Sequence, residues 1–198
     1  QMFNVYLIWA QKTFQTHFFG MTMPITWMLS LDAIVSTAMI GASVAFWRWY
    51  ARHRTEPDEI TKLTIGVGIA ALAPLMLVAA SAIAAGSGQP VSLGWALAFH
   101  LVNDIGLANV LPVSLALYSR AAPKGLEGLM IAVYYLQFFL GNMLVGYIGT
   151  FYEAMTPVNF WLLHVALMLL AGAVLLAARR FTGDVLAPRH EAPHPAAS

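Results

Sequence analysis

Three charged residues stand inside apolar stretches that are long enough to cross a lipid bilayer: Lys12, Asp32 and Asp104. A charge at bilayer depth costs about 2.5–3.5 kcal/mol on insertion scales, so each of the three is a candidate functional residue. Asp104 is the most deeply placed, near the middle of "FHLVNDIGLANVLPVSLAL", residues 99–117. The sequence therefore raises the question of what an aspartate does in a segment otherwise suited to lipid.

Helical periodicity places His100, Asn103, Asp104 and Leu107 on one face of this segment, because residues three and four apart lie above one another. We expect that face to point toward a cavity or another helix rather than toward lipid. Two interpretations fit Asp104: it contacts a substrate or a proton, or it fastens helices together through a structural hydrogen bond. The spacing of His100 and Asp104 also suits a metal ion, but a single pair is a weak indication, and we predict no metal site.

Lys12 and Asp32 lie in consecutive apolar segments joined by a short turn, so antiparallel packing could bring them together. One interpretation is an internal ion pair that neutralises both charges. The other is a pair that binds a charged substrate and forms again when the substrate leaves. A carboxylate held between an apolar surrounding and a nearby cation could exchange a proton near neutral pH. Asp32 and Asp104 are therefore the candidate proton-coupling residues.

The elements that must position these residues follow from composition. Of the residues, 60% are hydrophobic and 10% are charged, whereas an average soluble domain has about half and a quarter. Cysteine is absent, which excludes disulfides, thiolate metal sites and a cysteine nucleophile.

A spanning helix needs about 20 apolar residues. We predict an all-α membrane protein, a six-transmembrane-helix bundle, with spans at 2–20, 24–49, 62–86, 92–118, 126–151 and 157–178. The first span is the least apolar. Pro74 and Pro112 sit mid-span and should kink their helices.

The turns between these spans alternate in charge. "WRWYARHRTEPDEITK", "YSRAAPKGLEG" and the tail after the sixth span carry lysine and arginine, and the opposite turns carry neither. The positive-inside rule then places the basic turns and the C-terminus in the cytoplasm. We expect a multi-pass protein of the cytoplasmic (inner) membrane. Residues 1–180 should form the bundle, and the Pro- and Ala-rich residues 181–198 a disordered tail. The chain does not begin with Met, which suggests a piece of a longer protein.

Two stretches carry a resemblance to a known family. "MPITWMLSLDAIV" is similar to the eighth transmembrane helix of the proton-dependent oligopeptide transporter family, where a Ser-Trp-Phe-Gln-Ser-Leu-Asn-Pro pattern is usual. "GLANVLPVSLALYSRAAPKGLEGLMIAVYYLQFFLGNMLVG" resembles the tenth and eleventh helices of that family with the cytoplasmic turn between them. Order, spacing and loop lengths match over almost the whole chain. The resemblance implies the C-terminal half, helices seven to twelve, of a major facilitator transporter.

The resemblance assigns expected roles unevenly. Positions that keep the family pattern are Trp27, Ser30, Pro112, Gly141 and Asn142. The family's pocket asparagine on the eighth helix falls at Asp32, and its pocket tryptophan on the eleventh falls at Tyr134. The glutamate that meets the amino terminus of the peptide falls at Leu107, so the charge is lost there. The residue near the middle of the seventh helix, often acidic in the family, falls at Gln11 or Lys12. We hypothesise that Asp32 or Asp104 replaces the lost glutamate.

The resemblance thus implies the C-terminal half of a proton-coupled symporter that imports di- and tripeptides by alternating access. Its expected partners are a small peptide, the lipid bilayer and a missing N-terminal six-helix bundle. We expect no enzyme activity, no nucleic acid and no cofactor, with the proton as coupling ion. The expected substrate-binding residues are Lys12, Trp27, Asp32, Asn103, Asp104, Leu107 and Tyr134. Other classes remain open: a haem-binding subunit with His100 and His164 as ligands, and a six-span scaffold without transport activity.

Overall fold

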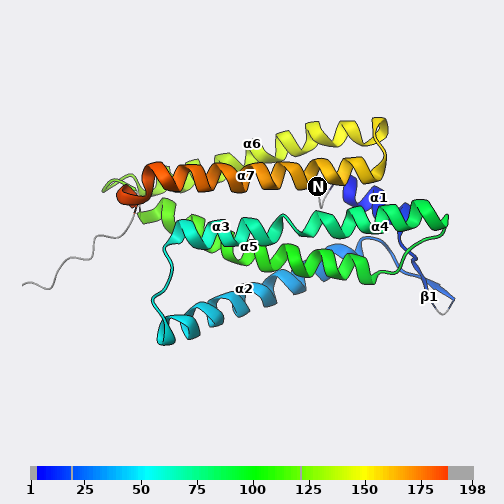
Figure 1. Ribbon diagram of the computed structural model, residues 1–198, viewed down its shortest axis with the longest axis horizontal. Helices are drawn as coiled ribbons and strands as arrows, with labels where there is room; N and C mark the ends of the chain where they lie inside the picture. Colours follow the sequence, from blue (N-terminus) through cyan, green and yellow to red (C-terminus); the bar gives the residue numbers. More distant parts are fainter. Residues whose placement is uncertain (1–3, 19, 121, 187–198) are drawn as a thin grey trace, which may run out of the picture.

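The computed structural model describes residues 4–18, 20–120 and 122–186, and helices dominate it (Figure 1). Apolar segments in lipid fold as helices because a helix pairs its own backbone N–H and C=O groups, which lipid cannot do. The elements are α1 (Val5–Thr13), β1 (His17–Phe18), β2 (Met21–Thr22), α2 (Trp27–His53), α3 (Glu59–Ala70), α4 (Ala73–Ser87), α5 (Gly94–Arg120), α6 (Glu127–Gly149), the short 3₁₀ helix η1 (Thr150–Ala154) and α7 (Pro157–Leu186). The predicted all-α membrane class is confirmed.

Five helical segments of the described residues are long and apolar enough to cross a membrane, and they correspond to the second to sixth predicted spans. The first predicted span, 2–20, is corrected by the structure, because α1 covers nine residues. The chain leaves the helix at Phe14 to pair with the turn before α5. There the Gln15 N–H donates to the Val91 carbonyl at 2.9 Å, and the Val91 N–H donates to the Thr13 carbonyl at 2.9 Å. This pairing competes with a further turn of helix.

The third predicted span is broken where a proline predicted a kink. Helix α3 ends at Ala70 and α4 begins at Ala73, with Pro74 in its first turn. Proline lacks the N–H that a continuous helix would need there and is well tolerated in a first turn. Helix α5, in contrast, continues through Pro112 from Gly94 to Arg120. One proline therefore ends a helix and the other does not.

Helix α5 is the centre of the bundle. It packs against α2 and α3, and α3 and α4 in turn pack against α7. Figure 1 shows α2 on one side of α5 and the α6–α7 pair on the far side of α3 and α4. The end of α2, the end of α5 and the C-terminal end of α7 lie together at one end of the bundle (Figure 1). The segments that carry most of the basic residues thus share one end.

Helices α3 and α5 approach each other through glycines. A Cβ added to Gly66 would lie 2.8 Å from the Gly106 carbonyl oxygen, and one added to Gly106 would lie 2.7 Å from the Ala70 backbone nitrogen. Both distances are shorter than a carbon atom tolerates. Small residues at such positions let two helices come close in a membrane, where dispersion contacts replace the hydrophobic drive. This contact sets the position of α5 and of the polar residues on it.

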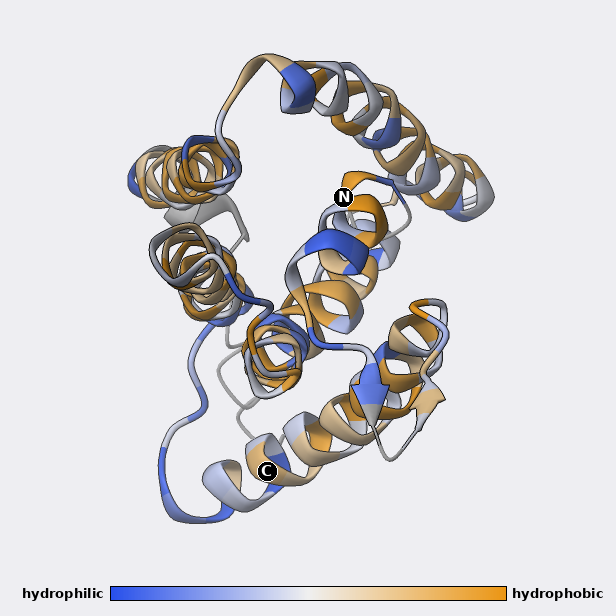
Figure 2. Cartoon of the chain, turned by 90° about the vertical axis from the view of Figure 1, so that its right-hand side faces the viewer, coloured by the Kyte–Doolittle hydropathy of each residue, from blue (hydrophilic) through white to orange (hydrophobic). Residues whose placement is uncertain are grey.

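The apolar surface of the bundle is largely exposed. On α6, Tyr134 is the one buried residue, while Phe139, Met143 and Tyr147 are each at least 60% exposed. Figure 2 shows apolar residues along the helices of the bundle. Such surfaces are far larger than a soluble monomer exposes. The chain is therefore a multi-pass membrane protein.

A small core lies at the opposite end from the basic turns. It joins α1 to α4, α5 and the start of α7 and contains Trp9 and Trp161, which are 0% and 2% exposed. The Trp9 indole N–H donates to the Ser81 hydroxyl of α4 at 3.0 Å. This hydrogen bond provides an acceptor for the indole N–H, which would otherwise be unpaired inside the core.

Asn109 ties α2 to α5. Its side-chain oxygen accepts a hydrogen bond from the Trp47 indole at 2.7 Å and another from the Ser43 hydroxyl at 3.1 Å. Its amide donates to the Ile105 carbonyl of its own helix at 2.7 Å. Asparagine on one helix thus satisfies two donors on another, which is a common way for polar residues to join helices in a membrane.

Replacing Asn109 with alanine should lower the free energy of unfolding by about 1 kcal/mol, since each interhelical hydrogen bond in a membrane contributes about 0.6 kcal/mol. Ser43→Ala removes one of the two bonds and should have about half the effect. Thermal unfolding of the purified full-length protein, followed by intrinsic fluorescence, measures both. Equal midpoints for wild type and Asn109→Ala would contradict the link.

The predicted boundary between bundle and tail, at residue 180, differs from the observed end of α7. Helix α7 continues past residue 180 to Leu186. The predicted disorder of the remainder of the tail concerns residues 187–198, which lie outside the described residues.

Candidate functional site

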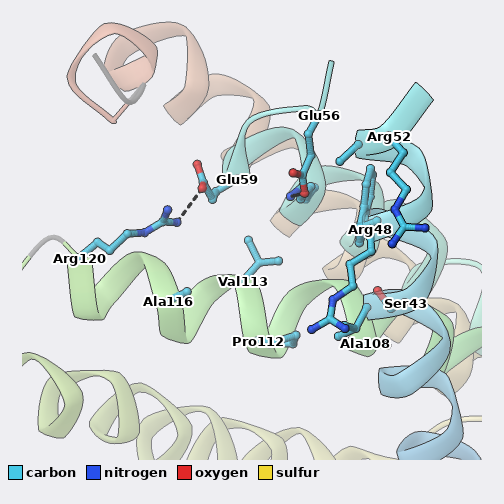
Figure 3. Close-up of a pocket in the computed structure, with 14 residues that line it drawn as sticks. Ser43, Arg48, Arg52, Glu56, Glu59, Ala108, Pro112, Val113, Ala116 and Arg120 are labelled. Carbon is cyan, nitrogen blue, oxygen red and sulfur yellow. Dashed lines mark hydrogen bonds and ion pairs between the residues drawn. The ribbon is translucent and has the colours of Figure 1, made fainter. Parts of the chain in front are cut away.

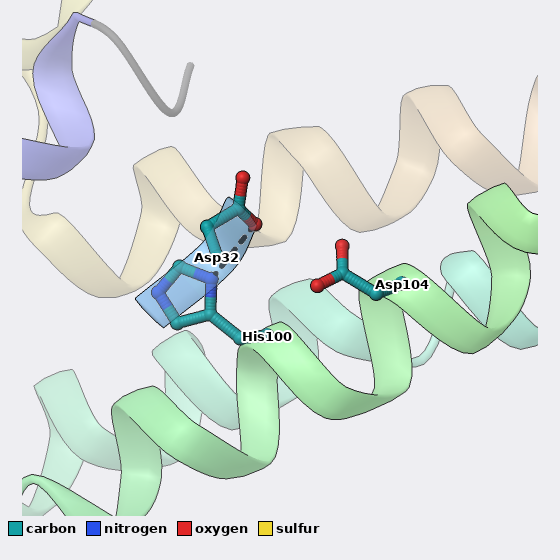
Figure 4. A group of neighbouring side chains, drawn as sticks. All are labelled: Asp32, His100 and Asp104. Carbon is teal, nitrogen blue, oxygen red and sulfur yellow. Dashed lines mark hydrogen bonds and ion pairs between the residues drawn. The ribbon is translucent and has the colours of Figure 1, made fainter. Parts of the chain in front are cut away.

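Three polar side chains from two helices meet in the interior of the bundle. His100 and Asp104 lie one turn apart on α5, and Asp32 reaches them from α2 (Figure 4). His100 Nδ1 lies 3.1 Å from Asp32 Oδ1. The metal-ligand type atoms of the three side chains lie within 4.8 Å of one another. We call Asp32, His100 and Asp104 the polar cluster.

The polar cluster is shielded from its surroundings. His100 and Asp104 are 0% and 1% exposed, and the side chain of Asp32 is 21% exposed. A charge in such a place is expensive unless it is paired. The ion pair of Asp32 with a protonated His100, or their neutral hydrogen bond, meets this requirement.

Tyr6 of α1 completes a hydrogen-bonded chain through the histidine. Its hydroxyl lies 3.0 Å from His100 Nε2, and the two rings are in edge-to-face contact. With Asp32 ionised and His100 neutral, Nδ1 donates to the carboxylate and Nε2 accepts from Tyr6. Adding a proton to the imidazole makes both nitrogens donors, so the Tyr6 hydroxyl must turn and accept. One proton therefore reorients a contact between α1 and α5.

Only one of the two Asp104 carboxylate oxygens makes a hydrogen bond to the described residues. Oδ1 accepts a hydrogen bond from the Asn103 amide at 3.2 Å. Oδ2 is buried and has no hydrogen-bond partner among the described residues. An unpaired buried carboxylate oxygen is costly, so this position favours a proton, an ammonium group or another cation. The Oδ1 bond stays within α5, because Asn103 is the neighbouring residue on the same helix, so neither oxygen of Asp104 makes a hydrogen bond to another helix among the described residues.

A cavity of about 490 Å³ lies beside the polar cluster. Its volume falls within the range of about 300–1,000 Å³ that small-molecule sites occupy. Four predicted site residues line it, namely Asp32, Asn103, Asp104 and Leu107. The wall also includes Tyr6, Trp161 and His164, so α1 and α7 contribute to it. The structure thus brings together most of the polar residues that the sequence singled out.

Three predicted site residues do not line this cavity. Lys12 is exposed on α1, and Asp32 pairs with His100 rather than with it. Trp27 begins α2, is 61% exposed and lines a different, apolar hollow beside Leu93 and Leu97. Antiparallel packing of consecutive segments predicted proximity for Lys12, but α1 packs against α4, and the lysine remains exposed.

Tyr134 lies behind the cavity wall. It is 3% exposed, and its hydroxyl donates to the Leu111 carbonyl at 3.3 Å and lies 3.2 Å from the Ser114 hydroxyl. Leu111 itself lines the cavity. Tyr134 therefore supports the part of α5 that faces the cavity, from the neighbouring helix α6.

The histidines are not arranged as haem ligands. Both ring nitrogens of His100 are engaged, with Tyr6 and Asp32. His164 uses Nδ1 on the Phe160 carbonyl at 2.9 Å, and its Nε2 has no hydrogen-bond partner among the described residues. A haem would need one free nitrogen from each ring, and His100 offers none.

Similarity to known proteins bears on what this cavity does. The peptide transporter YePEPT of Yersinia enterocolitica is 29% identical over 164 residues, which cover 79% of this chain. A di-/tripeptide transporter of Lactococcus lactis is 23% identical over 141 residues, or 69% of the chain. The chain is a relative of bacterial peptide transporters. The predicted resemblance is thereby confirmed, and both relatives are transporters rather than enzymes.

This relative of the peptide transporters spans about a third of the length of the curated proteins it matches, 32% of the first and 28% of the second. No family model matches the chain. Neither the haem-binding nor the scaffold interpretation is favoured by these similarities. The residues that sequence reasoning missed are Tyr6 and the pairing of His100 with Asp32, since α1 and α2 approach α5 from distant parts of the chain.

Proposed function

We propose that this chain is the C-terminal half of a proton-coupled symporter that imports di- and tripeptides by alternating access. The observation that carries the proposal is the similarity to two peptide transporters over most of the chain, combined with a cavity whose wall holds the carboxylates of Asp32 and Asp104. The missing partner is an N-terminal six-helix bundle. The exposed apolar faces of α2 and α6 offer it a surface.

The proposed orientation places the basic end of the bundle in the cytoplasm. The end of α2, the end of α5 and the C-terminal end of α7 share that end (Figure 1). The positive-inside rule favours this topology in the inner membrane, with the C-terminus in the cytoplasm. Rocking of the two halves around the cavity would then expose it to each side in turn.

Asp104 is proposed to take the peptide's amino terminus. In the related family a glutamate meets that ammonium group, and its position falls at Leu107 here. Asp104 lies about one turn earlier on the same helix, and both residues line the cavity. Its free Oδ2 can accept a charge-assisted hydrogen bond, which is about twice as strong as a neutral one.

The proton is proposed to occupy the pair formed by Asp32 and His100. The titratable groups that face this pair are Tyr6 from α1, Asp104 from α5 and His164 from α7. Helices α4 and α6 contribute apolar wall through Leu77 and Val145. A proton on the pair removes the negative charge that Asp32 presents to Asp104. Without that repulsion between the two carboxylates, Asp104 can carry its own negative charge and meet the peptide ammonium, so a proton on the pair favours peptide binding at Asp104.

The test is uptake of a labelled dipeptide by the full-length protein in proteoliposomes with an acidic exterior. Accumulation above the external concentration that an uncoupler abolishes is expected. An N-acetylated dipeptide, which lacks the ammonium group, should compete at least about tenfold less well, as loss of one charged hydrogen bond predicts. Uptake indifferent to the gradient would refute proton coupling. Equal competition by the acetylated peptide would refute the role of the amino terminus and favour a substrate without a free amine.

A further inference from the structure

A second cavity, of about 500 Å³, lies at the basic end of the bundle, remote from the polar cluster along α2 and α5. It is formed by the end of α2, the start of α3 and the last turns of α5 (Figure 3). The charged residues that line it are Arg48, Arg52, Lys62, Arg120, Glu56 and Glu59. Four cations and two carboxylates leave the lining with a net charge of +2, from the same six residues.

Both carboxylates of this lining are already used by two of the cations. Arg120 donates to Glu59 at 2.7 Å, and Lys62 pairs with Glu56. The Lys62 ammonium also lies 5.0 Å from the centre of the Trp47 ring, where a cation is attracted to the aromatic face. These contacts hold Lys62 and Arg120 in place as fixed parts of the wall.

Arg48 and Arg52 have no acidic partner among the described residues. They lie one turn apart on α2, and Figure 3 shows their side chains extending beside the cavity without the ion pair that Arg120 makes. A pair of guanidinium groups on one helix face can hold a phosphate with two-pronged hydrogen bonds. The excess positive charge of the lining is therefore concentrated on these two arginines.

The opposite wall of the cavity is apolar. It consists of Ala108, Pro112, Val113 and Ala116 from α5, with Val44 from α2. A neighbouring apolar cavity of about 580 Å³, lined by Met39, Phe46, Ile65 and other apolar residues, shares Ser43 and Trp47 with it. A cationic rim above an apolar wall matches a molecule with an anionic head and a hydrocarbon body. Free phosphate has no hydrocarbon part that could contact the apolar wall.

The position of the cavity agrees with this chemistry. The lining includes residues from two of the basic segments that share one end of the bundle, and Val44 beside it is 42% exposed. Basic pockets between transmembrane helices on the cytoplasmic side are suited to the head groups of anionic lipids, because Lys and Arg side chains are attracted to an anionic membrane surface.

We propose that Arg48 and Arg52 bind the phosphate of an anionic phospholipid whose acyl chains lie against α2 and α5 at the basic end of the bundle. The lipid bridges α2, α3 and α5, so its binding stabilises the contacts among the three. This site is independent of the peptide and proton chemistry proposed above.

The test uses the full-length protein purified in a neutral detergent, with native mass spectrometry to count retained lipid and thermal unfolding to measure stabilisation. Dioleoyl phosphatidylglycerol should remain bound and raise the unfolding midpoint, whereas dioleoyl phosphatidylcholine should not. The double variant Arg48→Gln/Arg52→Gln should weaken phosphatidylglycerol binding at least about tenfold, consistent with the loss of two charged contacts.

The matched control is Arg54→Gln/Lys124→Gln, which removes the same charge from the same end of the bundle. Both residues are exposed, and neither lines the cavity. Binding lost equally in both double variants would overturn the site and indicate a diffuse surface field. Stabilisation by millimolar inorganic phosphate equal to that by the lipid would overturn the lipid assignment.

Should the glutamine variant not fold, Arg48→Lys/Arg52→Lys retains the charge and should keep at least part of the lipid binding. Complete loss of binding in a folded lysine variant, or unchanged binding in every variant, would refute the site.

Discussion

Asp104→Asn is expected to raise the KM for peptide uptake by about 10- to 100-fold in the full-length protein, with a smaller effect on the maximal rate. The physical reason is the loss of a charge-assisted hydrogen bond to the peptide ammonium, which contributes about 1.5–3 kcal/mol. The free Oδ2 atom of Asp104 faces the interior without a partner among the described residues, so the bound peptide would supply the missing contact. Initial rates of labelled dipeptide uptake across a concentration series measure both constants.

Asp32→Asn should behave differently, and the difference separates the two roles. The asparagine cannot exchange a proton with His100, so accumulation driven by the proton gradient should fall at least about tenfold. Exchange of internal for external peptide without a gradient should persist, because the ammonium site on Asp104 is intact. Ser36→Ala is the matched control: Ser36 lines the same cavity, but its hydroxyl bonds the Ala33 carbonyl of its own helix at 3.3 Å.

Each outcome bears on a distinct part of the proposal. Rescue of KM by Asp104→Glu would support a carboxylate that meets the ammonium group. Equal loss of gradient-driven uptake and of exchange in Asp32→Asn would contradict a specific role in proton coupling. Unchanged uptake in both Asp32→Asn and Asp104→Asn would refute the proposal that one of these aspartates replaces the family's glutamate, whose position is Leu107 here.

Gly66→Val is expected to destabilise the bundle by about 3 kcal/mol or more, because it adds a branched side chain where helices α3 and α5 touch. Overpacking a well-packed site costs about 1–3 kcal/mol even when side chains can yield. Here one of the obstructing atoms is the Gly106 backbone carbonyl oxygen, at 2.8 Å from the added Cβ. A backbone atom moves only with its helix, and α5 carries His100 and Asp104.

Gly68→Val is the control for Gly66→Val. Gly68 lies two residues further along α3, is exposed, and has nothing within 4 Å of an added Cβ. Both variants make the same change of helix propensity, so their difference isolates the contact with α5. The measurements are the thermal midpoint and the monodisperse fraction of the full-length protein in detergent. Equal loss in the two variants would show that the close approach contributes nothing.

Apolar length and prolines made much of the fold predictable. Five of the six predicted spans are present, because lipid forces any apolar run of sufficient length to pair its own backbone. The break at Pro74 followed from its missing N–H. The first span was predicted on the same grounds and is a nine-residue helix here. Its end depends on pairing with Val91, a residue far away in the chain, which no local pattern reveals.

The candidate site was predictable in part for a related reason. The shared face of His100, Asn103 and Asp104 follows from helical periodicity, which is local. The pairing of Asp32 with His100, in place of Lys12, depends on how α2 crosses α5. That crossing is set by contacts such as the Asn109 link and the glycine approach. The hydrophobic pattern does not indicate which faces of two helices pack together, because apolar residues that face lipid and apolar residues that face protein cannot be distinguished in a membrane sequence.

By itself the sequence determined that this chain is a helical membrane protein, where most of its helices lie, which residues carry charge into the bilayer, and which family it resembles. These properties depend on the transfer of individual residues and short segments from water to lipid. Tertiary structure alone decided which charges meet inside the bundle, that Asp104 Oδ2 has no hydrogen-bond partner among the described residues, and that Arg48 and Arg52 line one cavity with neither paired to an acidic residue in the described part of the chain. Those properties depend on distances between helices, and these are set by close packing of small residues and a few polar contacts between segments far apart in the chain.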